Sequence, residues 1–473
     1  MESESQSGLD MLMSFVEKAE LPREWVRDFA ATSADDDKAA ASTEDVQAAE
    51  EMRKVFAQVK ANVARAVVAI SGDDTNMVEL FSGSSGFIGR LKAWIRYDPK
   101  TRDDVVSCGM LALGNLARSD AHCLSLVQEH ELAPFLASFL AQADDIKVAH
   151  GLVSLLKNLS IPAANKAIIG QLGVIDAVVR FLNRDKDMVQ PLQFATVGLL
   201  KHLCAGVTAN AVRFVDGDRG SSRRGDSLNA LIDMIQRIDD VPTKMEATRV
   251  LVNVVKSLWT SARSSDSSEA PALTEEAVLA ARSRVVRRDV IQALAEMVRT
   301  SPKYPVLVNE GVIALTLVGS DRMGAELVSL SLLAEPNKAK ADEDEDEAMA
   351  SDNEMDALRT SRRRSTVDSS ASTSSHPLPP PERALDMVNL VLARRDARMP
   401  PQFASNACAL VLSLCHATQG ATSSTGAVGQ EAVGRVATQT QAALQQLKDQ
   451  GPTEALSAAA DALEAVSKAA VAA

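Results

Sequence analysis

Residues 103–187 read DDVVSCGMLALGNLARSDAHCLSLVQEHELAPFLASFLAQADDIKVAHGLVSLLKNLSIPAANKAIIGQLGVIDAVVRFLNRDKD, and they contain one phrase twice. LALGNLARSDAHC and LLKNLSIPAANK each end one amphipathic helix and begin another. Asn115 and Asn158 hold the same place in the two copies, 43 residues apart. A unit of about this length, built only from helices, therefore repeats along the chain.

Each unit is predicted to hold a short, a middle and a long helix. In the first complete unit the short and middle helices cover 122–128 and 132–141, and Asp144 and Asp145 open the long one. The triplet recurs after Pro162. Three helices per unit favour armadillo repeats over two-helix HEAT repeats. The sequence therefore predicts an all-α armadillo fold, a right-handed superhelical solenoid of three-helix repeats.

The register of the two asparagines continues along the chain. The next equivalent places hold His202, Asn253, Leu317 and Ser413. The longer steps contain polar insertions, which account for the extra residues. The polar residue at this place is thus kept best over 103–260.

Four segments follow from this pattern. Residues 1–43 are predicted to be mostly disordered with one short helix, and 44–335 to form armadillo repeats, of which the part to about 102 is an N-terminal cap. Residues 336–381 combine an acidic run, an Arg triplet, serines and prolines, which cannot bury enough apolar surface to fold. Residues 382–473 are predicted to form an armadillo-like repeat and an Ala- and Gln-rich helical cap.

Composition restricts the functional class. The chain has 63 acidic and 50 basic residues, a net charge of −13, which argues against nucleic acid as a partner and permits a basic one. The five cysteines show no CxxC pair, so we expect a reducing compartment. The start MESESQSGLD is unlike a signal peptide, and no apolar run reaches the ~18 residues of a membrane span. We expect a cytoplasmic monomer without a transmembrane segment.

No constellation of catalytic, metal-binding or cofactor-binding residues emerges. The six histidines are scattered without an HExxH motif, and GxSxG, GxxxxGK[ST] and GxGxxG motifs are absent. We therefore expect a binding protein without catalytic residues, metals or cofactors, and rate an enzyme with an unrecognised site lowest.

The repeated polar residues Asn115, Asn158, His202 and Asn253 are predicted to line the inner groove of the solenoid. An asparagine amide carries donors and an acceptor, so it can hold the backbone of an extended peptide. The alternative is that Asn115 and Asn158 satisfy helix-end carbonyls of the adjoining turn. Their spacing does not separate the two roles.

Acidic residues gather around the same positions, at Asp103, Asp104, Asp120, Asp144, Asp145 and Asp187. Several lie at predicted helix starts, where capping and the helix dipole account for each one singly. Together they would make one rim of the groove acidic, which would attract a basic segment of a partner in a salt-dependent way.

The motif RRRS at 362–365 has the form of a site for a basophilic kinase, with Ser365 as the candidate phosphosite. Such motifs are frequent by chance in disordered segments. Regulation by phosphate on Ser365 is therefore a hypothesis with a common alternative.

Three phrases go beyond a general armadillo pattern: SCGMLALGNLARSDAHC, LKNLSIPAANKAIIG and QPLQFATVGLLKHLCAG. Together they resemble the Smg GDS family, armadillo-repeat stimulators of GDP dissociation from Rho- and Rap-type small GTPases. The likeness is strongest over 103–215. The chain has fewer repeats than the animal members, and a long insertion interrupts its C-terminal half.

The resemblance implies a guanine-nucleotide exchange factor without a catalytic residue set. It also implies binding of GDP-bound or nucleotide-free GTPases through a polybasic, prenylated C-terminus, with a chaperone-like role toward the lipidated tail. The competing interpretation is a general armadillo adaptor that binds extended peptides or partner helices without exchange. An importin-like clamp is disfavoured, because Leu111 and Ser154 stand where such clamps place tryptophans.

Overall fold

The computed structural model describes residues 7–21, 43–81, 86–217, 226–260, 273–335, 381–393, 399–417 and 427–472. Within these ranges every regular element is a helix, which confirms the predicted all-α armadillo fold. The chain divides into two compact units. Unit 1 contains Met1–Met234 and Ile238–Val250, and unit 2 contains Ile235–Arg237 and Leu251–Ala473.

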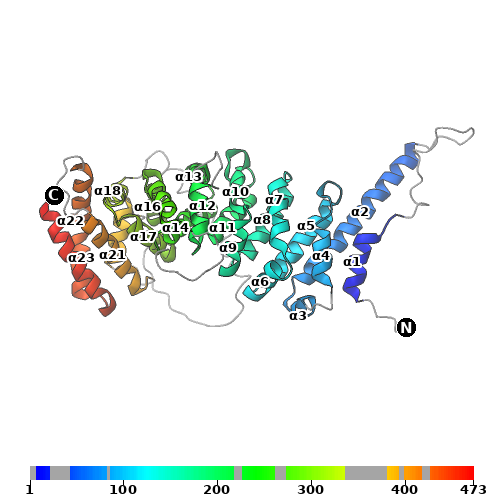
Figure 1. The fold of residues 1–473 in the computed structure, drawn as a ribbon, viewed down its shortest axis with the longest axis horizontal. Coiled ribbons are helices and arrows are strands. Elements are labelled where there is room, and N and C mark those ends of the chain that lie inside the picture. Colours follow the sequence, from blue (N-terminus) through cyan, green and yellow to red (C-terminus); the bar gives the residue numbers. More distant parts are fainter. Residues whose placement is uncertain are drawn as a thin grey trace, which may run out of the picture. The chain divides into compact units, whose positions relative to one another are not determined.

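The helices of unit 1 follow one another along the chain (Figure 1). They are α1 (Gly8–Lys18), α2 (Thr43–Ser71), η1 (Asp74–Asn76), α3 (Met77–Phe81), α4 (Phe87–Trp94), α5 (Pro99–Leu116), α6 (Asp120–Gln128), α7 (Leu132–Gln142), α8 (Ile146–Leu159), α9 (Ala163–Gln171), α10 (Val174–Val179), η3 (Arg180–Leu182), η4 (Arg184–Lys186), α11 (Gln190–Cys204) and α12 (Thr208–Asp216). The boundary between the units falls within α13 (Asp226–Arg237) and α14 (Val241–Thr260).

Three helices make each repeat of unit 1. Helices α6, α7 and α8 form one repeat, and α9, α10 with η3, and α11 form the next. The long helices α2, α5, α8 and α11 pack side by side in this order. The predicted sequence of short, middle and long helices is thus confirmed in both repeats.

Helix α8 shows why these sequences form the long helices. Asp145 is its N-cap, and the side chain accepts hydrogen bonds from the backbone N–H groups of Lys147 and Val148 at 2.9 and 3.0 Å. Seven apolar residues at helical spacing are buried between its neighbours: Val148, Ala149, Leu152, Val153, Leu155, Leu156 and Leu159. The following Pro162 stands at the start of α9, where it lacks an N–H that the helix would leave unpaired.

The corner between the short and the middle helix has the same backbone conformation in both repeats. Glu131, directly before α7, has φ 51°, and Gly173, directly before α10, has φ 76°. Glycine adopts this left-handed conformation without the steric cost that a Cβ imposes. The packing of the repeat therefore imposes this turn, whether the residue is glycine or glutamate.

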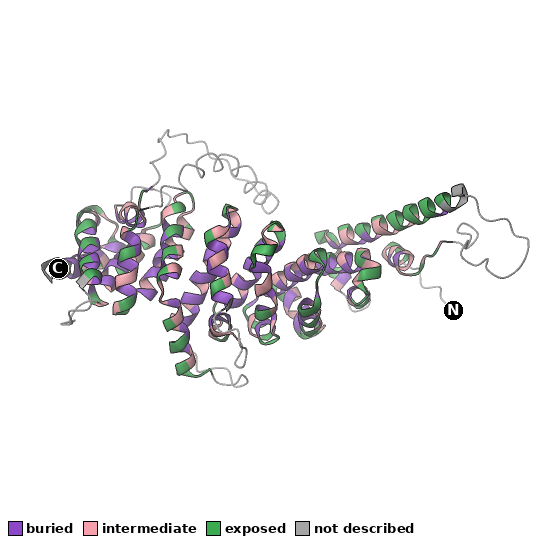
Figure 2. Ribbon diagram, turned by 90° about the horizontal axis from the view of Figure 1, so that it is seen from above, coloured by how far each residue is buried: buried purple, intermediate pink, exposed green. Residues whose placement is uncertain are grey.

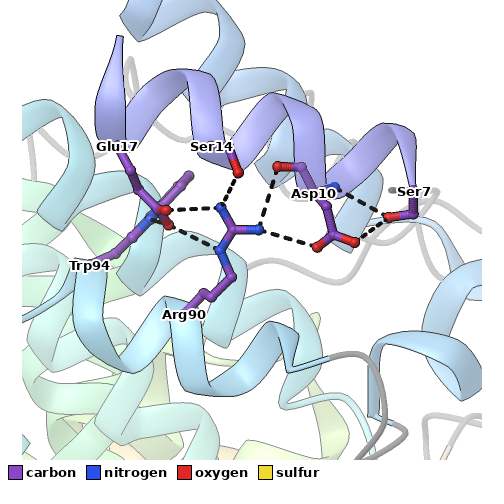
Figure 3. Close-up of polar contacts among 6 residues, drawn as sticks. All are labelled: Ser7, Asp10, Ser14, Glu17, Arg90 and Trp94. Atoms are coloured by element: carbon purple, nitrogen blue, oxygen red, sulfur yellow. Dashed lines mark hydrogen bonds and ion pairs between the residues drawn. The ribbon is translucent and has the colours of Figure 1, made fainter. Parts of the chain in front are cut away.

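Helix α1 is held against α4 by the Arg90 guanidinium (Figure 3). Arg90 pairs with Asp10 and Glu17 at 3.1 and 2.9 Å, and the Trp94 indole N–H donates to Glu17 at 2.7 Å. Burial raises the pKa of Glu17, but the hydrogen bonds of Arg90 and Trp94 outweigh it and hold that pKa below the usual value. The short helix predicted near the N-terminus is thus present; it packs against α2 and is joined to α4 through Arg90.

Residues 47–59 of α2 are mostly exposed, whereas buried residues become more frequent after residue 63 (Figure 2). Val55 and Val59 are apolar but 59% and 42% exposed, whereas Val67 is fully buried. Among the described residues, the core of unit 1 therefore involves mainly the C-terminal half of α2, with Ala49 as a buried residue of the first half.

Unit 2 contains two further repeats and two long terminal helices. Its helices are α15 (Glu275–Val285), α16 (Arg288–Thr300), α17 (Pro305–Val318), α18 (Arg322–Leu333), α20 (Ala384–Leu392), α21 (Pro401–Ala417), α22 (Ala427–Gln450) and α23 (Thr453–Ala472). Helices α15, α16 and α17 form one repeat, and α18, α20 and α21 form the next. Helices α22 and α23 pack against each other, α22 also against α18 and α23 against α21.

The large insertion interrupts a repeat of unit 2 without changing its register. Residues 336–380 of the predicted insertion lie outside the described residues, between the short helix α18 and the middle helix α20. Beyond it, the Ser413 hydroxyl donates to the carbonyl oxygens of Thr316 and Gly319, both at 3.3 Å. Because α17 and α21 pack together as neighbouring long helices, Ser413 takes the place in its repeat that the sequence register predicts.

The five cysteines are core residues. All are buried as free thiols, and burial raises the pKa of each, to about 12 for Cys204 and Cys408. Such thiols behave as small hydrophobic side chains.

Candidate partner-binding face

Each long helix of unit 1 presents one partly exposed stripe to solvent. On α8 the stripe holds Lys147, His150, Ser154, Lys157 and Asn158, which are exposed or half-buried, while the opposite side is buried. Residues three and four apart lie above one another on a helix, so these side chains form a row. Because α5, α8 and α11 pack side by side, their stripes adjoin. We call the stripes of these three helices the ladder face.

Asn115 and Asn158 bind the long helix of the preceding repeat. The Asn115 amide N–H groups donate to Val68 O at 3.0 Å and Ser71 Oγ at 3.3 Å, in the last turn of α2. The Asn158 amide donates to Gly114 O at 3.3 Å, near the end of α5. Both amides thus satisfy helix-end groups, on the neighbouring long helix rather than in the adjoining turn. Neither side-chain oxygen is engaged by another described residue, so contact with a peptide stays a prediction.

The other two places of the row differ from this pattern. Burial, reinforced by the charges of Lys201 and Lys166, lowers the pKa of His202 to about 4. The imidazole is therefore neutral near pH 7 and offers one donor and one acceptor. Asn253 lies on the part of α14 that belongs to unit 2, so its role beside the others also stays a prediction.

A second pair of asparagines, which the sequence analysis missed, joins the short helices to the rest of the solenoid. Asn165 is fully buried, and its amide donates to Cys123 O and Leu159 O, both at 2.9 Å. Asn210 is 1% exposed, and its amide donates to Lys166 O and Leu203 O at 2.8 and 2.9 Å.

The sequence carried a signal for this pair. Asn165 and Asn210 are 45 residues apart, close to the 43 and 44 residues that separate the members of the exposed row. Each follows an alanine near the start of a short helix, in IPAANK and GVTANA. In the preceding repeat the equivalent place holds His122, whose ring stacks on Phe81 with the centroids 4.0 Å apart.

The predicted acidic rim is largely engaged in local structure. Asp145 caps α8, as described above. Asp104 pairs with Arg102 at 3.1 Å, directly after the backbone kink at Arg102 from which the regular part of α5 begins. The Asp187 carboxylate accepts a hydrogen bond from Gln193 at 2.9 Å.

The six acidic residues also lie at two different edges of the ladder face. Asp103, Asp104, Asp144, Asp145 and Asp187 stand at the N-terminal ends of α5, α8 and α11. Asp120 follows the C-terminal end of α5, which at 1.5 Å per residue lies about 20 Å from Asp103. The carboxylates of Asp103 and Asp144 are exposed and make no hydrogen bond or ion pair with another described residue.

The opposite edge carries basic side chains that the sequence analysis did not single out. Lys157 on α8, Lys201 on α11 and Arg249 on α14 surround the carboxylate of Glu246, and all four residues belong to unit 1. Glu246 pairs with Lys201 and, at 2.8 Å, with Arg249. Three cations thus stand around one carboxylate. We call these four residues the basic cluster.

The pKa values of the basic cluster reflect partial burial. Burial raises the pKa of Glu246, but the hydrogen bonds and charges of Lys201 and Arg249 hold it below the usual value. Burial and then the nearby Lys201 lower the pKa of Lys157, and Glu246 opposes this shift. The Lys157 ammonium is therefore less well compensated than its two cationic neighbours.

Two further expectations concern a phosphosite at Ser365 and the absence of a transmembrane segment. Ser365 lies outside the described residues. Among the helices that the structure describes, none is long and apolar enough to cross a membrane.

The chain is similar to several solved structures, and no protein-family model matches it. An engineered protein from a structural genomics programme is 14% identical with a TM-score of 0.42, over 71% of this chain and 98% of that one. A designed armadillo repeat protein is 10% identical with a TM-score of 0.42, over 71% and 99%. A second designed armadillo repeat protein, in complex with the peptide (KR)4, is 10% identical with a TM-score of 0.40, over 71% and 99%.

Three known proteins are similar in sequence. Rap1 GTPase-GDP dissociation stimulator 1-A of Xenopus laevis is 30% identical over 151 residues, 31% of this chain and 24% of that protein. Stimulator 1-B of the same species is 31% identical over 150 residues, with shares of 31% and 24%. The GTPase-GDP dissociation stimulator vimar of Drosophila melanogaster is 32% identical over 138 residues, with shares of 28% and 20%.

Each match spans a quarter or less of the relative's length. The resemblance carried by the three sequence phrases is nevertheless confirmed at the level of the family. Over about 30% of its length, the chain is similar to Rap1 GTPase-GDP dissociation stimulators, at 30–32% identity.

Proposed function

We propose that this protein binds small GTPases and stimulates the dissociation of GDP from them. The observation that carries the proposal is the sequence similarity to three GDP dissociation stimulators, at 30–32% identity over 138–151 residues. The armadillo fold supports it, because adjoining stripes of parallel long helices offer a broad surface to a folded partner.

The preferred partners are Rho- and Rap-type GTPases with a polybasic, prenylated C-terminus. The exposed carboxylates of Asp103 and Asp144, at the N-terminal edge of the ladder face, would attract such a basic segment. Chaperone-like protection of the lipidated tail belongs to the same proposal.

Exchange needs no catalytic residue in this protein. A binder accelerates GDP release if it holds the nucleotide-free GTPase more tightly than the GDP-bound form, because only differential affinity shifts the equilibrium. A hundredfold acceleration corresponds to about 2.7 kcal/mol of such preference in the transition state of release. We therefore propose a binding protein rather than an enzyme with its own chemistry.

The test is release of mant-GDP from purified Rho- and Rap-type GTPases, prenylated and unprenylated, with and without this protein. We expect faster release and salt-dependent complex formation with the polybasic GTPases. A GTPase whose basic tail has been neutralised provides the comparison for the tail.

A charge-reversal pair separates the two edges of the ladder face. Asp103→Lys with Asp144→Lys should weaken binding to the polybasic tail several-fold at 50 mM salt, and less at higher salt. Asp120→Lys reverses an exposed aspartate at the other edge and should leave that binding nearly unchanged. The proposal is excluded if the protein binds none of these GTPases and accelerates GDP release from none of them. Binding without release would support the adaptor interpretation.

A further inference from the structure

The Lys157 ammonium is an unusual cation in this fold. It is half-buried, and it makes no hydrogen bond or ion pair with any residue that the structure describes. The only carboxylate in the basic cluster, Glu246, is already held by Lys201 and Arg249. Burying a charge without a direct partner costs free energy, so the position needs a reason.

The packing of the Lys157 stem fixes where the ammonium lies. A Cβ added to Gly198 on α11 would meet Lys157 Cδ at 3.1 Å, so the aliphatic stem crosses α11 at a residue without a side chain. The stem thus runs from α8 toward α11, where Lys201 stands one turn beyond Gly198. The two lysines approach each other closely enough for Lys201 to depress the pKa of Lys157.

A purely structural role explains Lys157 poorly. Cations near helix C-termini often stabilise the final carbonyls. Lys166 does this, since its ammonium donates to Ala205 O at 3.2 Å. Lys157 has no such acceptor among the described residues, and an uncharged side chain of equal length would pack on Gly198 equally well.

We propose that Lys157, together with Lys201, binds carboxylate side chains of an acidic segment in a partner protein. Lys201 and Arg249 already hold the carboxylate of Glu246, which shows that cations at this edge bind a carboxylate. A second carboxylate between Lys157 and Lys201 would repeat the arrangement and provide Lys157 with a charged partner.

Carboxylates fit this place better than phosphate. The cations lie at the C-terminal ends of α8 and α11, where the helix dipoles carry partial negative charge and oppose a dianion. The proposal does not depend on the exchange activity, because it concerns which segment binds and not what the partner does.

The experiment measures binding of fluorescein-labelled decapeptides of alternating Glu and Ala by fluorescence anisotropy at 50 and 150 mM salt. Decapeptides of Gln and Ala and of Lys and Ala are the comparisons. The full chain should bind the Glu peptide, and Lys157→Met should weaken this binding about tenfold or more, the effect of losing one charge-assisted contact.

The matched control is Lys147→Met, which removes an exposed lysine from the other end of α8. It should change the affinity less than about twofold, because a screened surface charge contributes little. Thermal unfolding gives a second measurement. Lys157→Met should unfold at the same or a higher temperature, since the methionine keeps the stem and removes an uncompensated charge.

A second variant tests the site in the opposite direction. Glu246→Gln removes the carboxylate that competes for Lys201 and Arg249, so it should bind the Glu peptide more tightly than the unchanged protein. The proposal is overturned if the Glu peptide does not bind at 50 mM salt or if Lys157→Met binds it equally well. It is also overturned if inorganic polyphosphate binds in a Lys157-dependent way and the Glu peptide does not. Because no GTPase is present, none of these results bears on nucleotide exchange.

Discussion

Asn165→Ala should destabilise unit 1 far more than Asn158→Ala, although both remove one asparagine. Asn165 is fully buried and joins three helices, because its amide donates to Cys123 O in α6 and to Leu159 O at the end of α8. The substitution leaves two carbonyls in a place that water does not reach. At about 1–3 kcal/mol for each buried group that loses its partner, the gross cost is roughly 2–6 kcal/mol.

One effect reduces this cost. The Asn165 side-chain oxygen is itself buried without a hydrogen bond from the described residues, and the substitution removes it. We therefore expect a net loss of about 2–3 kcal/mol. Asn158 is half-buried and makes a single bond of 3.3 Å, so its replacement should cost about 0.5 kcal/mol.

Thermal unfolding followed by circular dichroism distinguishes these values. In a unit of about this size, 1 kcal/mol shifts the midpoint by about 2–4 °C, so Asn165→Ala should lower it by roughly 5–10 °C. Amide hydrogen exchange should show the loss centred on α6 and α9. Equal shifts for the two variants, or a shift below about 2 °C for Asn165→Ala, would refute the reasoning that burial decides the cost.

Three further substitutions test other parts of unit 1. Gly170→Ala would place a Cβ 2.0 Å from the Asn210 side-chain oxygen and should lower the free energy of unfolding by about 1–3 kcal/mol. The Cβ of Gly89→Ala would meet nothing within 4 Å, so this control should stabilise its helix slightly. Urea unfolding of the two variants gives the comparison. The pKa of His202 is about 4 in the folded state and lies below its unfolded value, so the free energy of unfolding should fall as the pH drops from about 6.5 to 4. After allowance for solvent screening, we expect a loss of about 1–2 kcal/mol. Thermal midpoints measured across this pH range should show the loss, and His202→Asn should lack it. Arg90→Met should speed amide exchange in α1 roughly 5- to 30-fold, corresponding to 1–2 kcal/mol, and unchanged exchange would contradict the role of the guanidinium.

The repeat architecture could be predicted because each boundary carries a local signal. Asp145 caps α8 through backbone N–H groups two and three residues away, and Pro162 stands at the joint to the next helix. These signals depend only on neighbours in the sequence, so they are readable without the fold. The same is true of the period, which survives from Asn115 to Ser413 despite the insertions.

The partners of side chains could not be predicted in this way. From the sequence, Asp145 and Asp104 could either form a free acidic rim or make local contacts. The structure shows the local contacts. The basic cluster arises from helices on three repeats, so its members are about 45 residues apart in the sequence. A signal existed, because LLKNLS and LLKHLC both place a lysine directly before the repeated polar residue. Its meaning depends on Gly198 and Glu246, whose positions only the stacked helices reveal.

The ladder face carries opposite charges at its two ends, and this limits how a partner can lie on it. Asp144 at the start of α8 and Lys157 near its end are separated by 13 residues, about 20 Å along the helix. This distance exceeds the Debye length of about 8 Å at physiological salt, so the two ends act on a ligand almost independently. A single partner that contacts both must present a basic and an acidic segment about 20 Å apart, in one orientation. If the GTPase is that partner, Lys157→Met and the Asp103, Asp144 reversal should each weaken its binding, and their free energies should add within about 0.5 kcal/mol. If Lys157→Met weakens only the acidic peptide and leaves GTPase affinity unchanged, the two ends serve different partners.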